Sequence, residues 1–118
     1  MNANEYIDRA KIKYFDEKNF DGAIADITEA IRLEPDNCFA YYTRGLVYRG
    51  KNEFDAAIAD FTKAIQLEPK DCHLYFYRGL TYACKNNKAM AISDLEMAVK
   101  IDPMYADYRD ALDELRRL

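Results

Sequence analysis

The sequence predicts an all-α protein built from three consecutive repeats, each a pair of antiparallel helices. Two observations predict this class. Residues 20–35 (FDGAIADITEAIRLEP) and 54–69 (FDAAIADFTKAIQLEP) share twelve of sixteen letters at an offset of 34 residues. Between the few glycines and prolines, apolar residues recur at helical spacing. A fixed period of this length indicates small units that bury their apolar faces only by stacking on one another.

The period continues into a third, looser copy. Residues 88–103 (KAMAISDLEMAVKIDP) share five letters with the first copy. Positions that keep the 34-residue interval through all three copies include Pro35, Pro69 and Pro103; Ala23, Ala57 and Ala91; Asp26, Asp60 and Asp94; Ala30, Ala64 and Ala98. The period predicts one domain over residues 1–118, with repeats at 4–37, 38–71 and 72–105.

Within each repeat the spacing predicts two helices. In the second repeat, Tyr41, Gly45 and Tyr48 fall at i, i+4 and i+7 on one face of the first helix, and Ala57 and Phe61 begin a similar face on the second. Polar turns are expected near residues 17–20, 51–54 and 85–88. Asn37 and Asp71 stand where they can cap the next helix, and each proline marks the end of a pair.

Small and large residues alternate along these faces, as in interlocking helical layers. Gly45, Gly79 and the recurring alanines allow close approach of the backbones, and Tyr48, Phe61 and Leu95 fill the space beside them. We expect four tyrosines in the core: Tyr41, Tyr48, Tyr75 and Tyr82.

The last segment, ADYRDALDELRRL, has one apolar stripe formed by Tyr108, Leu112 and Leu115. Charged residues surround this stripe. It predicts a seventh helix over residues 106–118 whose apolar face covers the last repeat and whose other face meets water.

The positions in one repeat resemble the signature of the tetratricopeptide repeat, which has an aromatic, a Leu-Gly pair, a Tyr, an Ala, a Phe and a Pro at set spacings. The second repeat supplies Tyr41, Arg44-Gly45, Tyr48, Ala57, Phe61, Ala64 and Pro69. The third supplies Tyr75, Arg78-Gly79, Tyr82, Ala91, Leu95, Ala98 and Pro103, and the first supplies Ile7, Ala10-Lys11, Tyr14, Ala23, Ile27, Ala30 and Pro35. The resemblance implies a right-handed α-α superhelical solenoid.

One departure from that signature concerns charge. Arg44 and Arg78 replace the usual leucine beside the tight glycine, so each guanidinium is expected to be partly buried and to need a partner. The recurring Asp26, Asp60 and Asp94 are the candidates, in the same repeat or in the preceding one. There are three such aspartates and two arginines, because Ala10 holds the place in the first repeat.

The composition of the chain argues against several classes of function. The net charge of −4 and pI near 5.0 give no general attraction to nucleic acid or to an anionic membrane. No apolar run could span a bilayer, and the N-terminus lacks a signal-peptide pattern, so we expect a cytoplasmic protein. Three cysteines and the single His73 suggest neither a disulfide framework nor a metal site. We expect no catalytic residues and no cofactor.

The resemblance implies that the first helix of each repeat lines a concave groove that binds peptides. The groove would be lined by Ile12, Phe15, Phe39, Tyr42, Thr43, Leu46, Arg49, His73, Phe76, Tyr77 and Leu80. The alternative is that these aromatics only pack on one another. Glu5, Asp8 and Asp16 would favour a basic residue at the N-terminal end of the groove.

Some family members grip an acidic chaperone C-terminus with a clamp of two Lys, two Asn and one Arg. The matching positions here are Asp8, Ile12, Thr43, His73 and Tyr77, and none carries the clamp residue. The expected partner is therefore another protein, through a segment with apolar or aromatic anchors rather than an acidic terminus. The expected role is that of an adaptor, scaffold or co-chaperone-like module. The alternative role is homo-oligomerisation through the groove or an end of the solenoid.

Overall fold

The computed structural model describes residues 1–118 and contains seven α helices and no β strand. The helices are α1 (Ala3–Phe15), α2 (Phe20–Leu33), α3 (Cys38–Gly50), α4 (Phe54–Leu67), α5 (Cys72–Cys84), α6 (Lys88–Ile101) and α7 (Ala106–Arg117). The predicted all-α class, the helix count and the positions of the turns are confirmed.

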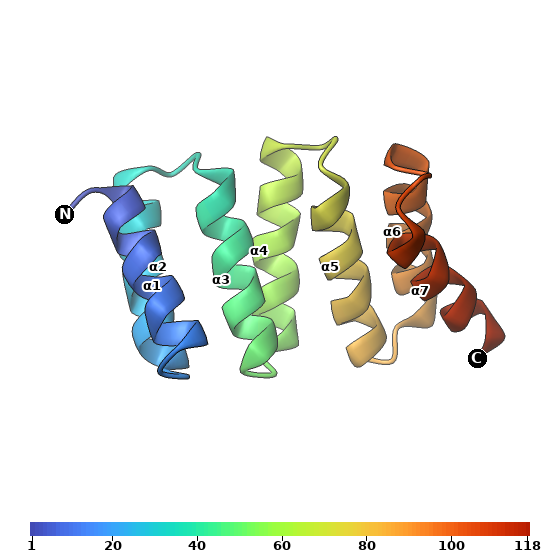
Figure 1. Ribbon diagram of the computed structural model, residues 1–118, viewed down its shortest axis with the longest axis horizontal. Coiled ribbons are helices and arrows are strands. Elements are labelled where there is room, and N and C mark those ends of the chain that lie inside the picture. Colours follow the sequence, from blue (N-terminus) through green and yellow to red (C-terminus); the bar gives the residue numbers. More distant parts are fainter.

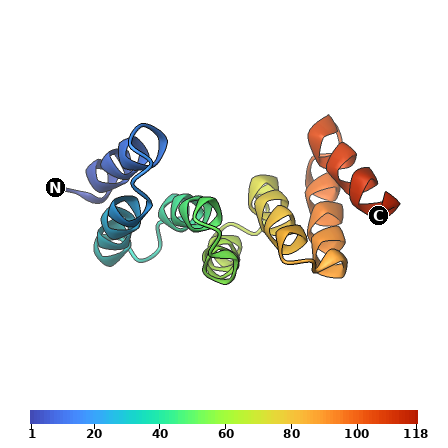
Figure 2. The ribbon, with the colours of Figure 1, turned by 90° about the horizontal axis from the view of Figure 1, so that it is seen from below.

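The helices form two rows in an elongated molecule of 45 × 25 × 21 Å. Neighbouring helices run side by side in opposite directions, and the two termini lie at opposite ends (Figure 1). Seen from below, α1, α3, α5 and α7 form one row, which is curved so that α1 and α7 lie towards the same side, and α2, α4 and α6 form the other (Figure 2). We call the exposed side of the α1–α3–α5–α7 row the inner face.

Alanine dominates the contacts between the helices. The fully buried alanines are Ala10, Ala23, Ala30, Ala40, Ala57, Ala64, Ala91 and Ala98. Ile27, Phe61 and Leu95 stand at equivalent positions of the three repeats and are also completely buried. At Gly45 an added Cβ would lie only 2.7 Å from the Phe61 ring, so this glycine permits the close approach of α3 and α4.

The expectation that four tyrosines belong to the core is wrong, because Tyr41, Tyr48, Tyr75 and Tyr82 are all only half-buried. Two of these rings flank one guanidinium, since Arg44 Cζ lies 5.8 Å from the Tyr41 ring centre and 5.9 Å from that of Tyr48. These tyrosines therefore lie beside the guanidinium groups at partly exposed positions rather than in the core.

The recurring aspartates of the second and third repeats bind the arginine of their own repeat. Arg44 donates from Nε to Asp60 Oδ2 at 2.7 Å and from Nη2 to Oδ1 at 2.8 Å. Arg78 makes the same two bonds to Asp94, each 2.8 Å long. The third nitrogen of Arg44, Nη1, donates to Thr28 of the preceding repeat at 3.2 Å. One guanidinium thus joins three helices.

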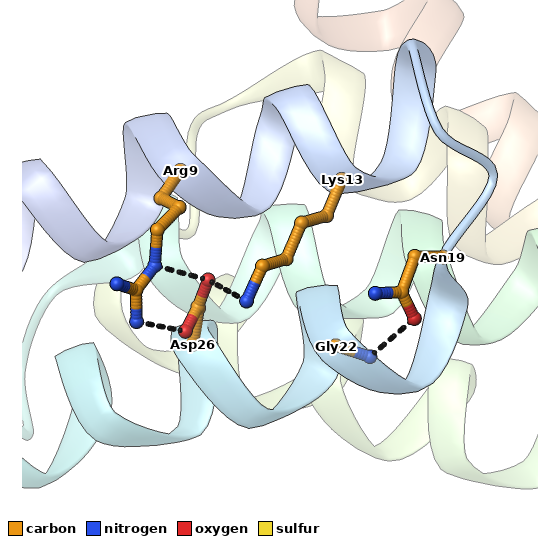
Figure 3. A network of polar contacts seen from close by, with 5 residues as sticks. All are labelled: Arg9, Lys13, Asn19, Gly22 and Asp26. Carbon is orange, nitrogen blue, oxygen red and sulfur yellow. Dashed lines mark hydrogen bonds and ion pairs between the residues drawn. The ribbon is translucent and has the colours of Figure 1, made fainter.

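Asp26 of the first repeat has different partners (Figure 3). Arg9 donates from Nε and Nη2 to its two oxygens at 2.9 and 2.8 Å, and Lys13 Nζ lies 2.9 Å from Oδ2. The hydrogen bonds from Arg9 are the main cause that holds the pKa of Asp26 below its usual range, and Lys13 adds to this effect. Burial acts in the opposite direction. Two cations from neighbouring positions of α1 replace the one that Ala10 cannot supply.

Side chains close the helix ends. The predicted caps are confirmed, since Asn37 accepts from the Ala40 amide at 3.1 Å and Asp71 accepts from the His73 amide at 3.0 Å. Asn19 caps α2 in the same way, through the Gly22 amide (Figure 3). The turn inside each repeat places one residue in the left-handed region: Lys18 (φ 53°), Asn52 (φ 65°) and Asn86 (φ 62°).

Candidate functional site

The eleven residues predicted to line a groove all lie on α1, α3 and α5, but their exposure differs. Ile12, Phe15, Phe39 and His73 are exposed, Thr43 is buried, and the other six are half-buried. The hydroxyl of Thr43 donates to the Phe39 carbonyl of its own helix at 2.8 Å. Thr43 therefore belongs to the floor of the inner face, where its hydroxyl is already bonded.

Aromatic rings form a continuous chain from α3 across α5 to α7. Ring centres lie 6.1 Å apart for Phe39 and Tyr42, 5.8 Å for Tyr42 and Tyr77, and 5.2 Å for Tyr77 and Phe76. Phe76 then packs against Tyr108 at 4.9 Å. Burial is the main cause that raises the pKa of Tyr42 to about 12, and the neighbouring Tyr77 adds to it. Part of the aromatic content of the predicted groove is therefore explained by packing of these rings on one another.

Phe39 differs because 46% of it is exposed. It stands between two hollows of the inner face. The first cavity, of about 180 Å³, lies between α1 and α3 and is lined by Lys11, Tyr14, Phe15, Phe39, Tyr42, Thr43 and Leu46. Lys11 Nζ lies 4.6 Å from the Phe39 ring centre and places a cation at its rim.

The second cavity, of about 350 Å³, lies between α3 and α5. It is lined by Cys38, Phe39, Tyr42, Glu68, Asp71, His73 and Leu74. The lining combines apolar side chains with two carboxylates. These carboxylates, Glu68 and Asp71, come from the loop between α4 and α5. Burial, and then these two carboxylates, raises the pKa of the Cys38 thiol.

Leu80 is not brought to these two cavities. It lines a third hollow of about 170 Å³ together with Ala83 of α5 and Ala111, Glu114, Leu115 and Leu118 of the C-terminal segment. The predicted site is therefore divided, and α7 forms the wall of its far end.

α7 is held there by Tyr108, which is 1% exposed. Its hydroxyl lies 2.6 Å from His73 Nδ1 and 3.4 Å from Cys72 Sγ. Leu112 is also buried, as the apolar stripe predicts. His73, a predicted groove residue, is thus partly engaged by the last helix.

Arg49 lies near the end of α3 with its guanidinium 5.7 Å from the ring centre of Tyr77. It forms no ion pair and donates no side-chain hydrogen bond. Its Nε is the one buried side-chain nitrogen or oxygen that lacks a hydrogen-bond partner.

Sequence reasoning missed several residues of this face. The sequence pattern places Lys11 and Tyr14 in the repeat signature and Asp71 at a helix cap, and it gives Glu68 no role. Their helical or loop positions carried no signal that they would meet Phe39. Glu5, expected to favour a basic ligand residue, accepts a hydrogen bond from the Asn2 amide at 2.9 Å in a capping box. Arg9, which lies at an inner position of α1, is bonded to Asp26.

Two further facts bear on the class of site. No three His, Cys, Asp or Glu side chains are grouped so that they could hold a metal ion. None of the seven helices combines the length and the apolar character that crossing a membrane requires.

The fold and this face define a helical-repeat protein with an open, aromatic inner surface. The chain belongs to the tetratricopeptide repeat family, whose models match residues 6–37 and 38–71. These two matches together cover more than half of the chain. No curated protein sequence matches it.

Solved structures of the same fold cover nearly the whole chain. The first tetratricopeptide repeat domain of Spaghetti (RPAP3), bound to the HSP90 peptide SRMEEVD, has a TM-score of 0.91 at 22% identity, covering 98% of this chain and 91% of that one. The Arabidopsis OM64 domain has a TM-score of 0.89 at 24% identity, covering 98% and 94%. YrrB, described as having an unusual peptide-binding site, has a TM-score of 0.86 at 20% identity, covering 94% and 57%.

At these identities the likeness concerns the fold. The Spaghetti domain nevertheless runs against the expectation that an acidic peptide is excluded, since the fold itself accommodates one. For this chain the expectation rests only on its residues at five positions, where Asp8, Ile12, Thr43, His73 and Tyr77 stand.

Proposed function

We propose that this protein is an interaction module that binds a peptide segment of a partner protein along its inner face. The observation that carries the proposal is the position of Phe39, an exposed aromatic ring between two cavities. Exposed aromatic patches rimmed by charge are typical of interaction sites. A peptide side chain seated in either cavity would contact this ring.

The preferred ligand has apolar or aromatic anchors. The second cavity favours an anchor with a basic end, because Glu68 and Asp71 stand above the apolar wall formed by Phe39 and Leu74. A long side chain can bury its carbon stem there and keep its charged end beside the carboxylates.

Selection from a random 12-residue peptide library tests the proposal. The protein is immobilised as wild type, as Phe39→Ala and as Met97→Ala, a control on α6 in the other row. Recovered peptides should be rich in aromatic residues. Their affinity should fall roughly tenfold or more for Phe39→Ala, the range of an interface hot spot, and stay unchanged for Met97→Ala. Equal binding by all three proteins would exclude this face.

The peptide SRMEEVD gives a direct comparison with the Spaghetti domain. We expect weaker binding than for the selected peptides, because Asp8 places a negative charge where the acidic clamp has a positive one. Calorimetry with both ligands checks this expectation. Tighter binding of SRMEEVD would show that this chain prefers an acidic terminus.

The alternative function is self-association. Its structural support is three exposed methionines: Met90 and Met97 on α6, and Met104 in the loop that follows it. Sedimentation equilibrium over a hundredfold concentration range separates the two functions. A monomer throughout argues against homo-oligomerisation as the main role. A dimer that Met97→Asp and Met104→Asp convert to a monomer would favour it.

The roles of adaptor, scaffold or co-chaperone-like protein remain proposals that depend on the partner. A cytoplasmic location is also a proposal. Its support is that Cys38, Cys72 and Cys84 are all free thiols, which suits a reducing compartment.

A further inference from the structure

Arg49 on α3 forms no ion pair and donates no side-chain hydrogen bond, unlike three other arginines of α1, α3 and α5. Arg9 binds Asp26, Arg44 binds Asp60 and Arg78 binds Asp94, each through two hydrogen bonds. Arg49 has no acceptor at all, although its Nε is buried. A buried donor without a partner costs free energy, and such groups are rare in native proteins.

We propose that Arg49 binds the carboxylate of an aspartate or glutamate side chain within the peptide that occupies the inner face. This inference rests on the proposed function and adds a specificity position to it. A guanidinium offers donors in a planar fork that matches a carboxylate. The Tyr77 ring, 5.7 Å away, faces the guanidinium and restricts its position before a ligand arrives.

The charges around α3 favour an acidic ligand residue near its C-terminal end, while Lys11, 4.6 Å from the Phe39 ring centre, is a second cation on the α1 side. At the beginning of α3, Glu68 and Asp71 line the second cavity and repel a carboxylate. At its end, Arg49 attracts one. Phe39 and Arg49 are ten residues apart on one helix, which corresponds to about 15 Å. An extended peptide covers that distance in about four or five residues.

The ligand is therefore expected to carry an acidic residue about four or five positions from the residue seated beside Phe39. A basic residue, where present, should lie at the opposite end, near Glu68 and Asp71. This pattern distinguishes a ligand with one internal acidic residue from a peptide that is rich in acidic residues throughout.

The test repeats the library selection with Arg49→Met and Arg49→Glu. Methionine keeps an apolar stem against Tyr77 and removes the charge. The control is Arg32→Met, which removes an exposed arginine paired with Glu29 on α2. Wild type and Arg32→Met should enrich Asp or Glu at one fixed spacing from an aromatic residue. Arg49→Met should lose this enrichment, and Arg49→Glu should select Lys or Arg there.

Affinities of one selected, C-terminally amidated peptide then measure the contact. Replacing its acidic residue with alanine should weaken binding to wild type about tenfold and leave binding to Arg49→Met unchanged, as expected for a close charge pair. A free-acid version should bind no more tightly than the amide. Tighter binding of the free acid would assign Arg49 to a chain terminus and overturn the side-chain proposal.

The outcomes separate this inference from the proposed function. Aromatic peptides without an acidic position, bound equally by wild type and Arg49→Met, would overturn the role of Arg49 and keep the peptide-binding face. Failure of wild type to select any peptide would overturn both. Thermal melts of each variant, followed by circular dichroism, identify any loss of binding that comes from unfolding.

Discussion

Arg44 and Asp60 form a two-bond ion pair between α3 and α4, with donor–acceptor distances of 2.7 and 2.8 Å. The side chains are 19% and 7% exposed, so both charges are largely removed from water. Nη1 of the same arginine reaches Thr28 in the preceding repeat. The pair therefore joins the two helices of one repeat and ties that repeat to its neighbour.

Removing one partner of this pair should destabilise the protein strongly. Asp60→Ala leaves a buried guanidinium without its carboxylate and is expected to cost roughly 3–5 kcal/mol of unfolding free energy. Arg44→Leu leaves the Asp60 carboxylate unpaired and should also be costly. The double variant should recover much of the loss, because no buried charge remains. Urea denaturation of the four proteins measures the coupling, and additive losses would show that the pair does not act as a unit.

Gly45 and Gly79 occupy equivalent positions but should respond differently to alanine. A Cβ at Gly45 would lie 2.7 Å from the Phe61 ring, whereas at Gly79 the nearest atom is Asp94 Cβ at 3.1 Å. Gly45→Ala should therefore cost roughly 1–3 kcal/mol through overpacking. Gly79→Ala should be close to neutral, because the better helix propensity of alanine, worth about 1 kcal/mol, offsets a small shift. Thermal melts decide this, and equal melting temperatures would contradict it.

Lys18 is the least suitable of the three left-handed turn residues. Asn52 and Asn86 tolerate a positive φ, but lysine has a larger steric penalty at φ 53°. Lys18→Gly should raise the unfolding free energy by roughly 1 kcal/mol. Asn52→Gly, the matched control in the next repeat, should change it by less. A larger gain at Asn52 would show that residue type does not determine the strain in this turn.

Asp26 should contribute to the acid sensitivity of the fold. Arg9, and then Lys13, lowers its pKa in the folded protein. Its stabilising effect is therefore fully present above the unfolded value, near pH 4, and is lost as the pH falls through the folded value. Between pH 5 and pH 2.5, wild type should lose more unfolding free energy than Asp26→Asn. Asp36→Asn, a change in an exposed loop residue, should follow wild type. Parallel pH profiles for all three would exclude Asp26 as a source of the sensitivity.

Much of the fold was predictable because its determinants are local. The 34-residue period, the helical spacing and the capping residues Asn37 and Asp71 act over a few positions and recur. The recurring aspartates also indicated ion pairs between helices. The sequence left open whether Arg44 binds within its repeat, because a stacked array places α3 beside both α2 and α4.

The sequence by itself determined which residues form helices and which helical face each residue occupies, because spacing along one helix settles both. Only the tertiary structure decided which side chains from different helices meet. Asp26 takes Arg9 and Lys13, Glu68 and Asp71 reach the hollow beside Phe39, and Arg49 is left without an acceptor. These contacts depend on the packing of neighbouring helices and on the reach of long side chains, and a periodic pattern carries neither.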